Sequence, residues 1–237
     1  MKTVLKLILI YLIIVNIVLM VSRRLGVDGN VETVVSMALT VAFLYAEGCL
    51  GNAKRLFTPP SAALLGWSLP MGISFCLLLS MLMEWLPALP DWYESDFKVK
   101  VTSAWGIVVL VFLAPLFEEL FFRKALTDAL LKSCSPLGAI LCSGLLFGAF
   151  HLNPAQAVPA LIIGVLLAWI YYTTQSLLPT FLIHMANNAM AVWVLIYYPD
   201  VVHTWQLIGW PAYWVLLTAS LLLFVVSLRG FRRATAV

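Results

Sequence analysis

Long apolar runs, separated by short polar or proline-containing segments, dominate the chain. They lack the alternation of apolar and polar residues that marks the strands of membrane barrels. A helix needs roughly 20 apolar residues to cross a hydrocarbon core of about 30 Å, and it pairs its backbone polar groups within a single segment. The pattern therefore predicts eight membrane-spanning helices, over residues 3–22, 33–52, 61–86, 102–131, 136–153, 156–174, 178–197 and 208–228.

Composition agrees with this interpretation, because 63% of the 237 residues are hydrophobic and only 11% are charged. Soluble domains carry about 25% charged residues, so this chain has too few to cover a surface in water. The first apolar run is longer than the core of a signal peptide and is expected to be a retained helix. We find no soluble domain or internal repeat. The fold class predicted is an all-α polytopic membrane protein, with residues 1–237 forming one domain.

The positions of the basic residues predict an orientation. With eight spans both termini share a side, and most of the 14 Lys and Arg residues then fall in segments on that side. The positive-inside rule makes this side the cytoplasm, although the pair Arg23 and Arg24 falls outside. The net charge of +3 is thus explained by topology and contact with the lipid bilayer, and no nucleic-acid partner is expected.

Ionisable residues inside a span are costly and indicate function. The fourth span contains Glu118, Glu119 and Arg123. Glu119 and Arg123 are four residues apart, which is the spacing and order of a favourable ion pair on one helix face, so a structural role is predicted for them. Glu118 points about 100° away and has no such partner on its helix. Its carboxyl group is the candidate general base or acid.

Two of the three histidines also lie inside predicted spans. Phe147 and His151 share a face of the fifth span, and His184 and Asn188 share a face of the seventh. If spans four and five form a hairpin that turns near residue 134, Glu118 and His151 reach a similar depth at about 1.5 Å per residue. His184 lies only about six residues into its span, so a tilted or bent helix or an inward-dipping hairpin is needed to bring it level.

These residues, in this order, resemble the motifs of the CAAX-protease and bacteriocin-processing family, which includes the Ras-converting CAAX endopeptidases. The family's EExxxR, FxxxH and HxxxN motifs correspond to three pairs or groups within about residues 100–200: Glu118, Glu119 and Arg123; Phe147 and His151; His184 and Asn188. The resemblance implies about eight helices around an intramembrane cavity, and hydrolysis of a peptide bond. It implies that Glu118 and His151 activate a water, that His184 and Asn188 stabilise the oxyanion, and that Glu119 and Arg123 support the site.

Two questions stay open at the level of sequence. No HExxH motif is present and a metal-free mechanism is favoured, but Glu118, His151 and His184 are also possible zinc ligands. A proton-coupled transporter that uses the same residues as a relay is the alternative function, although the internal repeat common in transporters is not seen. The expected substrate is a membrane-associated peptide or protein. The small size resembles prokaryotic members of the family, which predicts a plasma (inner) membrane location with both termini in the cytoplasm.

Overall fold

The described residues, 1–52 and 55–236 of a computed structural model, form helices and connecting segments without a β-strand. Residues 53–54 and 237, which the predicted domain includes, lie outside them. Seven helical segments in this part of the chain are long and apolar enough to cross a membrane: α1 (Lys2–Leu25), α2 (Gly29–Ala46), α3 (Ala62–Met83), the composite segment Ala104–Leu131, α9 (Pro154–Thr174), α10 (Leu177–Tyr197) and α12 (Trp210–Ala234). The predicted polytopic all-α class is confirmed.

The composite segment is one continuous run built from five pieces: α5 (Ala104–Val108), the π-helix η2 (Val109–Leu113), α6 (Ala114–Glu118), the π-helix η3 (Glu119–Thr127) and α7 (Asp128–Leu131). Three further helices are shorter: α4 (Glu94–Lys100), α8 (Pro136–Ala149) and α11 (Thr204–Ile208). The predicted spans match the long helices to within several residues at each end. The largest shift of a start is in α2, which begins at Gly29 and not at residue 33, because Asp28 caps its first turn through Asn30 N and Val31 N.

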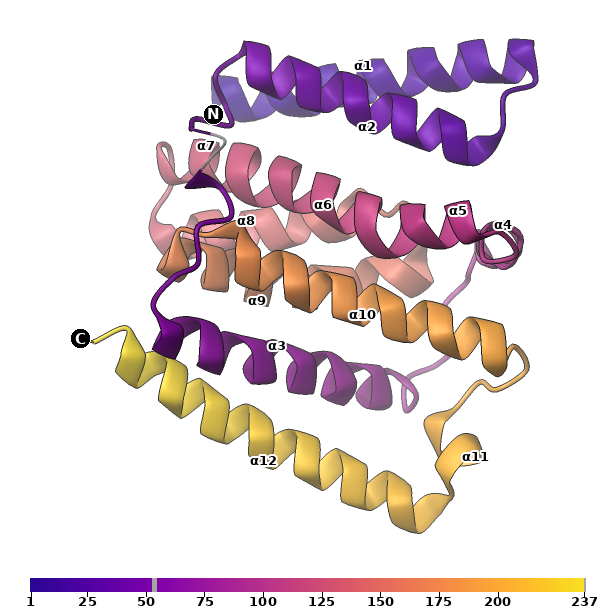
Figure 1. Ribbon diagram of the computed structural model, residues 1–237, viewed down its shortest axis with the longest axis vertical. Helices are drawn as coiled ribbons and strands as arrows, with labels where there is room; N and C mark the ends of the chain where they lie inside the picture. The colour runs from indigo at the N-terminus through magenta and orange to yellow at the C-terminus, as the bar shows by residue number, and fades with distance from the viewer. Residues whose placement is uncertain (53–54, 237) are drawn as a thin grey trace.

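The predicted span 136–153 corresponds to α8, whose 14 residues are fewer than a full crossing requires. The helix ends early because the chain turns at Leu152, which has a left-handed φ of 50°, and Pro154 then starts α9. α8 nevertheless packs along α9 as one arm of a hairpin, and both termini of the chain lie at the left-hand end of the bundle in Figure 1.

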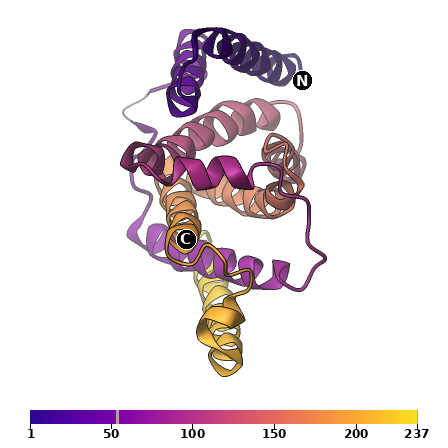
Figure 2. The ribbon, with the colours of Figure 1, turned by 90° about the vertical axis from the view of Figure 1, so that its right-hand side faces the viewer.

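The helices form three groups (Figures 1 and 2). The hairpin of α1 and α2 lies along one edge, and the pair of α3 and α12 lies along the opposite edge. Between them are the composite segment, α8, α9 and α10. The residues that carry the predicted motifs therefore belong to the central group, with α1 and α2 as an outer wall on one side.

Pro115 explains the irregular start of the composite segment. Proline lacks a backbone N–H and its ring clashes with the preceding turn, so the helix widens to π geometry just before it. In η2 the N–H of Ala114 donates to Val109 O, five residues back. Leu110 O is then left without a helical donor, because the N–H that would come next belongs to Pro115. This freed carbonyl becomes a binding point for another helix.

The hairpin of α8 and α9 packs closely through glycines, as is common between membrane helices. A Cβ atom at Gly148 would lie 2.6 Å from Ala157 O and 2.7 Å from Leu161 Cβ. Because the nearer atom belongs to the backbone, it cannot move aside without shifting α9. Gly148 thus sets the distance between the two helices, and with it the position of His151 at the end of α8.

We expect Gly148→Ala to lower the free energy of unfolding by about 1–3 kcal/mol, the usual cost of overpacking. Thermal unfolding of the purified protein in detergent measures this. Gly66→Ala in α3 is the matched control, since nothing lies within 4 Å of a Cβ there and alanine favours a helix. Equal unfolding temperatures for the two variants would contradict the assignment.

Candidate active site

A cavity of about 280 Å³ lies between the α1–α2 hairpin and the central helices. Glu118 from α6 and His151 from the turn after α8 both line it. The side chain of Glu118 is 23% exposed, although its Oε2 atom is buried. The sequence predicts that these two residues lie at a similar depth, and in the structure they line the same cavity. The remaining lining residues are Tyr11, Val15, Glu32, Thr33, Ser36, Met37, Phe117, Phe122 and Phe150.

Glu119 and Arg123 form an ion pair behind this cavity. The Nε of Arg123 donates to Glu119 Oε2 at 3.1 Å, and both side chains are fully buried. Arg123 also donates from Nη1 to Ser143 Oγ in α8 at 3.3 Å. The pair therefore joins the composite segment to α8, and each charge has the partner that burial in an apolar interior demands.

His184 connects both glutamates. Its Nδ1 lies 2.9 Å from Glu119 Oε1, and its Nε2 lies 3.5 Å from Glu118 Oε2. Because an ion-paired carboxylate accepts hydrogen bonds, the Nδ1–H donates to Glu119, which orients the ring and leaves Nε2 facing Glu118. His184 does not line the cavity, so it acts on Glu118 from the side of the protein interior.

The turn between α9 and α10, which precedes His184 on its helix, is buried. Ser176 is 3% exposed and Leu177 is fully buried. The Ser176 hydroxyl donates to Thr58 O at 2.7 Å, and the Leu177 N–H donates to Leu56 O at 2.9 Å. The segment after α2 thus covers the turn and pairs its backbone groups. Of the three arrangements that the sequence left open, a tilted helix, a bent helix and an inward-dipping hairpin, a buried turn is a feature of the third.

Asn188 lies one turn beyond His184 on the same helix, away from the cavity lining. Its Nδ2 donates to Leu110 O at 3.0 Å, the carbonyl freed by Pro115. This bond uses one of the two amide hydrogens and fixes α10 to the π-helical part of the composite segment. The structure therefore brings Glu118 and His151 together in the cavity, His184 next to them, and Asn188 further along α10.

Phe147 packs at the centre of the charged groups. The guanidinium carbon of Arg123 is 4.7 Å from the centre of its ring, within the range of a cation–π interaction. The rings of His151 and His184 meet the same ring edge-on, at centroid distances of 5.0 and 5.6 Å. One aromatic side chain thus separates the two imidazoles and holds each in a fixed orientation.

The backbone next to His151 is also fixed. Leu152 adopts a positive φ, which is rare for a side chain of this size and persists only where surrounding contacts impose it. Asn153, only 1% exposed, supplies those contacts. Its Nδ2 donates to Asp91 Oδ1 at 2.9 Å and its Oδ1 accepts from Trp92 N at 3.1 Å. The loop before α4 therefore holds the turn that carries His151, whose Nδ1 lies 2.8 Å from Phe147 O.

Sequence reasoning did not single out the cavity residues of the first two helices, above all Glu32 and Tyr11. A signal for Glu32 was available: it is followed at intervals of four by Ser36 and Thr40, so three polar residues share one face of α2. Ser36 and Thr40 are buried, and this polar face turns toward the composite segment. No comparable pattern marks Tyr11.

The zinc alternative is not supported by the geometry. In residues 1–52 and 55–236, no three His, Cys, Asp or Glu side chains are placed to hold a metal ion.

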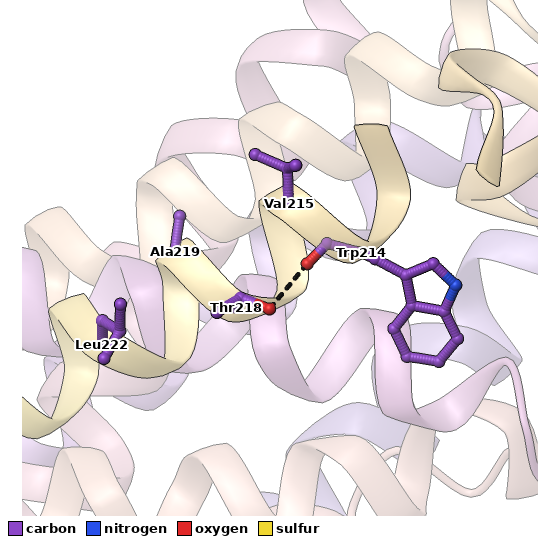
Figure 3. A pocket seen from close by; sticks show the side chains of 5 residues that line it. All are labelled: Trp214, Val215, Thr218, Ala219 and Leu222. Carbon is purple, nitrogen blue, oxygen red and sulfur yellow. Dashed lines mark hydrogen bonds between the residues drawn. The ribbon is translucent and has the colours of Figure 1, made fainter. Parts of the chain in front are cut away.

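A second hollow lies on α12, far from these residues in the chain (Figure 3). It is lined by Trp214, Val215, Thr218, Ala219 and Leu222, all exposed on one face of the helix. The Thr218 hydroxyl donates to Trp214 O at 2.8 Å, so its one polar side chain is satisfied within the helix. This apolar face suits contact with acyl chains and offers no group for catalysis.

The fold and the site define an integral membrane protein with a carboxyl group and an imidazole in a cavity within its helix bundle. Residues 100–190 match the family model described as type II CAAX prenyl endopeptidase Rce1-like, which is the family indicated by the sequence motifs. The match contains the composite segment, α8, α9 and His184 with Asn188, and it leaves α1–α3 and α12 outside. It supports a membrane protease as the general class. Comparisons with curated proteins and with solved structures gave no match.

Proposed function

We propose that this protein is an intramembrane endopeptidase that hydrolyses a peptide bond in a membrane-associated peptide or protein. The observation that carries the proposal is the shared cavity of Glu118 and His151, within the segment that matches the endopeptidase family. Hydrolysis needs a base for water, a place for negative charge and a proton for the leaving amine. Each requirement has a candidate group nearby.

In the proposed mechanism, Glu118 and His151 bind a water in the cavity, and Glu118 accepts one of its protons. The oxygen then attacks the carbonyl carbon of the substrate, whose C–N bond breaks as the proton passes to the amine. His184 Nε2 lies 3.5 Å from Glu118 Oε2, on the side of the carboxyl group that faces the protein interior. No serine or cysteine among the lining residues offers an elbow-type nucleophile, so attack by water is favoured.

We assign stabilisation of the oxyanion to His184 and Asn188; in this role His184 donates from an Nε2–H, in addition to the Nδ1–H that it gives to Glu119. Support comes from their common face on α10 and from the one amide hydrogen of Asn188 that the bond to Leu110 leaves available. An oriented donor of this kind contributes roughly 3–4 kcal/mol to transition-state stability in well-studied hydrolases. Glu119 and Arg123 position His184, and do not contact the substrate in this mechanism.

The test uses cell membranes, because no substrate has to be assumed. The wild-type chain and His151→Ala are expressed in the same host, and the membrane peptides of each are compared by mass spectrometry. We expect cleavage products that occur only with the wild type, at equal amounts of both proteins in the membrane. Identical peptide sets, at those equal amounts, would refute the proposed endopeptidase.

Metal removal separates the favoured mechanism from the zinc alternative. Because no three His, Cys, Asp or Glu side chains of the described residues are placed to hold a metal ion, we expect incubation with EDTA or phenanthroline to leave the cleavage rate within about twofold of the untreated protein. A structural or catalytic zinc site would lose its metal under the same treatment. The measurement is the rate of product formation by the purified protein before and after dialysis. Loss of activity that added Zn²⁺ restores would contradict the metal-free mechanism.

A further inference from the structure

The polar face of α2 contributes a carboxyl group to the cavity that none of the predicted motifs includes. Glu32 and Ser36 line the cavity together with Glu118 and His151, and Thr33 lies beside them. Glu32 stands in the first turn of α2, and this helix begins at the end of the bundle opposite the chain termini in Figure 1. One wall of the cavity thus carries the proposed water-activating groups, and the facing wall carries an additional acid.

Glu32 differs from the other glutamates and aspartates of the long helical segments in having no partner. In the described part of the chain, no hydrogen bond or ion pair reaches its side chain, and Arg23 and Arg24 at the end of α1 are exposed and do not contact it. The comparable acids are all paired, as the following contacts show: Glu118 with His184, Glu119 with Arg123, and Asp128 with Lys124.

Ionisable residues inside membrane helices are costly and indicate function, and Glu32 is half-buried in the wall of a cavity that also contains the candidate catalytic residues. Glu118 lines the same cavity, and its Oε2, which lies 3.5 Å from His184 Nε2, accepts no hydrogen bond from the described residues. Two carboxyl groups line the cavity, one from α2 and one from α6, and no Lys or Arg lines it. Carboxylates here would make the cavity negatively charged, which favours a cationic ligand.

We propose that Glu32 is a specificity-determining residue that binds a cationic group of the substrate near the scissile bond. That group is either a Lys or Arg side chain or a free N-terminal ammonium. This inference rests on the proposed endopeptidase function, and it narrows the substrate class to peptides with a positive charge at one fixed position relative to the bond. A carboxylate that is half-buried in a cavity binds such a charge more strongly than one in water, because screening is weaker.

The test uses the purified full-length protein in detergent micelles and synthetic lipid-anchored peptides as probes. Each peptide position carries Lys, Arg, Gln or Glu in turn, and mass spectrometry gives the cleavage rate. For the wild type we expect one position at which Lys or Arg is cleaved about 10- to 100-fold faster than Gln, in line with the strength of charged hydrogen bonds. Free and acetylated N-termini distinguish an ammonium from a side chain as the bound group.

Variants of Glu32 then show whether this residue recognises the positive charge of the peptide. In Glu32→Gln the ratio of the cleavage rates for the cationic and the neutral peptide is expected to fall to about one. In Glu32→Lys, the peptide with Glu at that position is expected to be cleaved faster than the peptide with Lys. Glu94→Gln is the matched control, an exposed acid paired with Lys98 in α4, and it should keep the wild-type ratio. Thermal unfolding checks that all variants are folded.

Two results would overturn the inference in distinguishable ways. If Glu118-dependent cleavage occurs and the charge preference of Glu32→Gln equals that of the wild type, Glu32 does not select the substrate, and the proposed function stands. If no peptide is cleaved in a Glu118-dependent manner, both the endopeptidase and the inference that depends on it are refuted.

Discussion

Replacement of Glu118 by Gln is expected to lower kcat/KM for peptide cleavage by about 10²- to 10⁴-fold, the range that a positioned general base contributes. Glutamine has the same shape and fills the same part of the cavity, but its amide cannot accept a proton from water. The measurement compares the rates of the purified wild type and variant on one lipid-anchored peptide. Since the side chain is 23% exposed and not tightly packed, the variant should unfold at nearly the wild-type temperature.

Two companion variants sharpen this result. Glu118→Asp keeps the carboxylate but withdraws it by one methylene, so an intermediate rate is expected if distance to the water matters. Glu47→Gln removes a different carboxylate, which is paired with Lys6 outside the cavity, and should cleave as the wild type does. A Glu118→Gln protein that cleaves within threefold of the wild type would exclude Glu118 as the base.

Local patterns in the sequence predict much of the fold and part of the site. Helix length and hydropathy suffice for the long spans, because a membrane helix pairs its own backbone groups whatever its neighbours are. The spacing of Glu119 and Arg123 is likewise a property of one helix, and the structure contains their ion pair. The common depth of Glu118 and His151 follows from counting residues on two arms of a hairpin.

Features that depend on contacts between distant segments could not be predicted in this way. The depth of His184 depends on a buried turn that Leu56 and Thr58 cover from a separate loop. The short α8 depends on Leu152, whose backbone conformation is held by Asn153 and its contacts with the loop before α4. A hydropathy pattern contains no information on which loop will meet which turn.

The contact of Asn188 with the composite segment follows from the effect of one proline on its helix. Pro115 removes a backbone donor, the helix before it becomes a π-helix, and Leu110 O is freed to accept from Asn188. The HxxxN spacing indicates which residues share a face of α10, but not that one amide hydrogen is already in use. Asn188 is therefore both a helix–helix contact and, in our proposal, an oxyanion donor.

Arg123 supports the site through three different contacts, and its loss should have the largest effect on stability. Its guanidinium pairs with Glu119, donates to Ser143 and lies over the ring of Phe147. Glu119 in turn accepts from His184, so the charge of Arg123 compensates a carboxylate on which the orientation of His184 depends. Both members of the pair are fully buried, and water cannot replace either.

We expect Arg123→Ala to lower the free energy of unfolding by about 3–5 kcal/mol, because it leaves the Glu119 carboxylate buried without a cation and opens a cavity under Phe147. Denaturant or thermal unfolding in detergent measures the loss.

Arg123→Met combined with Glu119→Gln removes both charges and keeps similar volumes. This double variant should recover much of the stability, since an apolar replacement of a buried ion pair is often neutral. The same double variant should still cleave poorly, because a neutral amide orients His184 less firmly than a carboxylate does. If Arg123→Ala unfolds within about 1 kcal/mol of the wild type, the charge of Arg123 is not needed to stabilise the buried Glu119, and the proposed support of His184 by this ion pair is refuted.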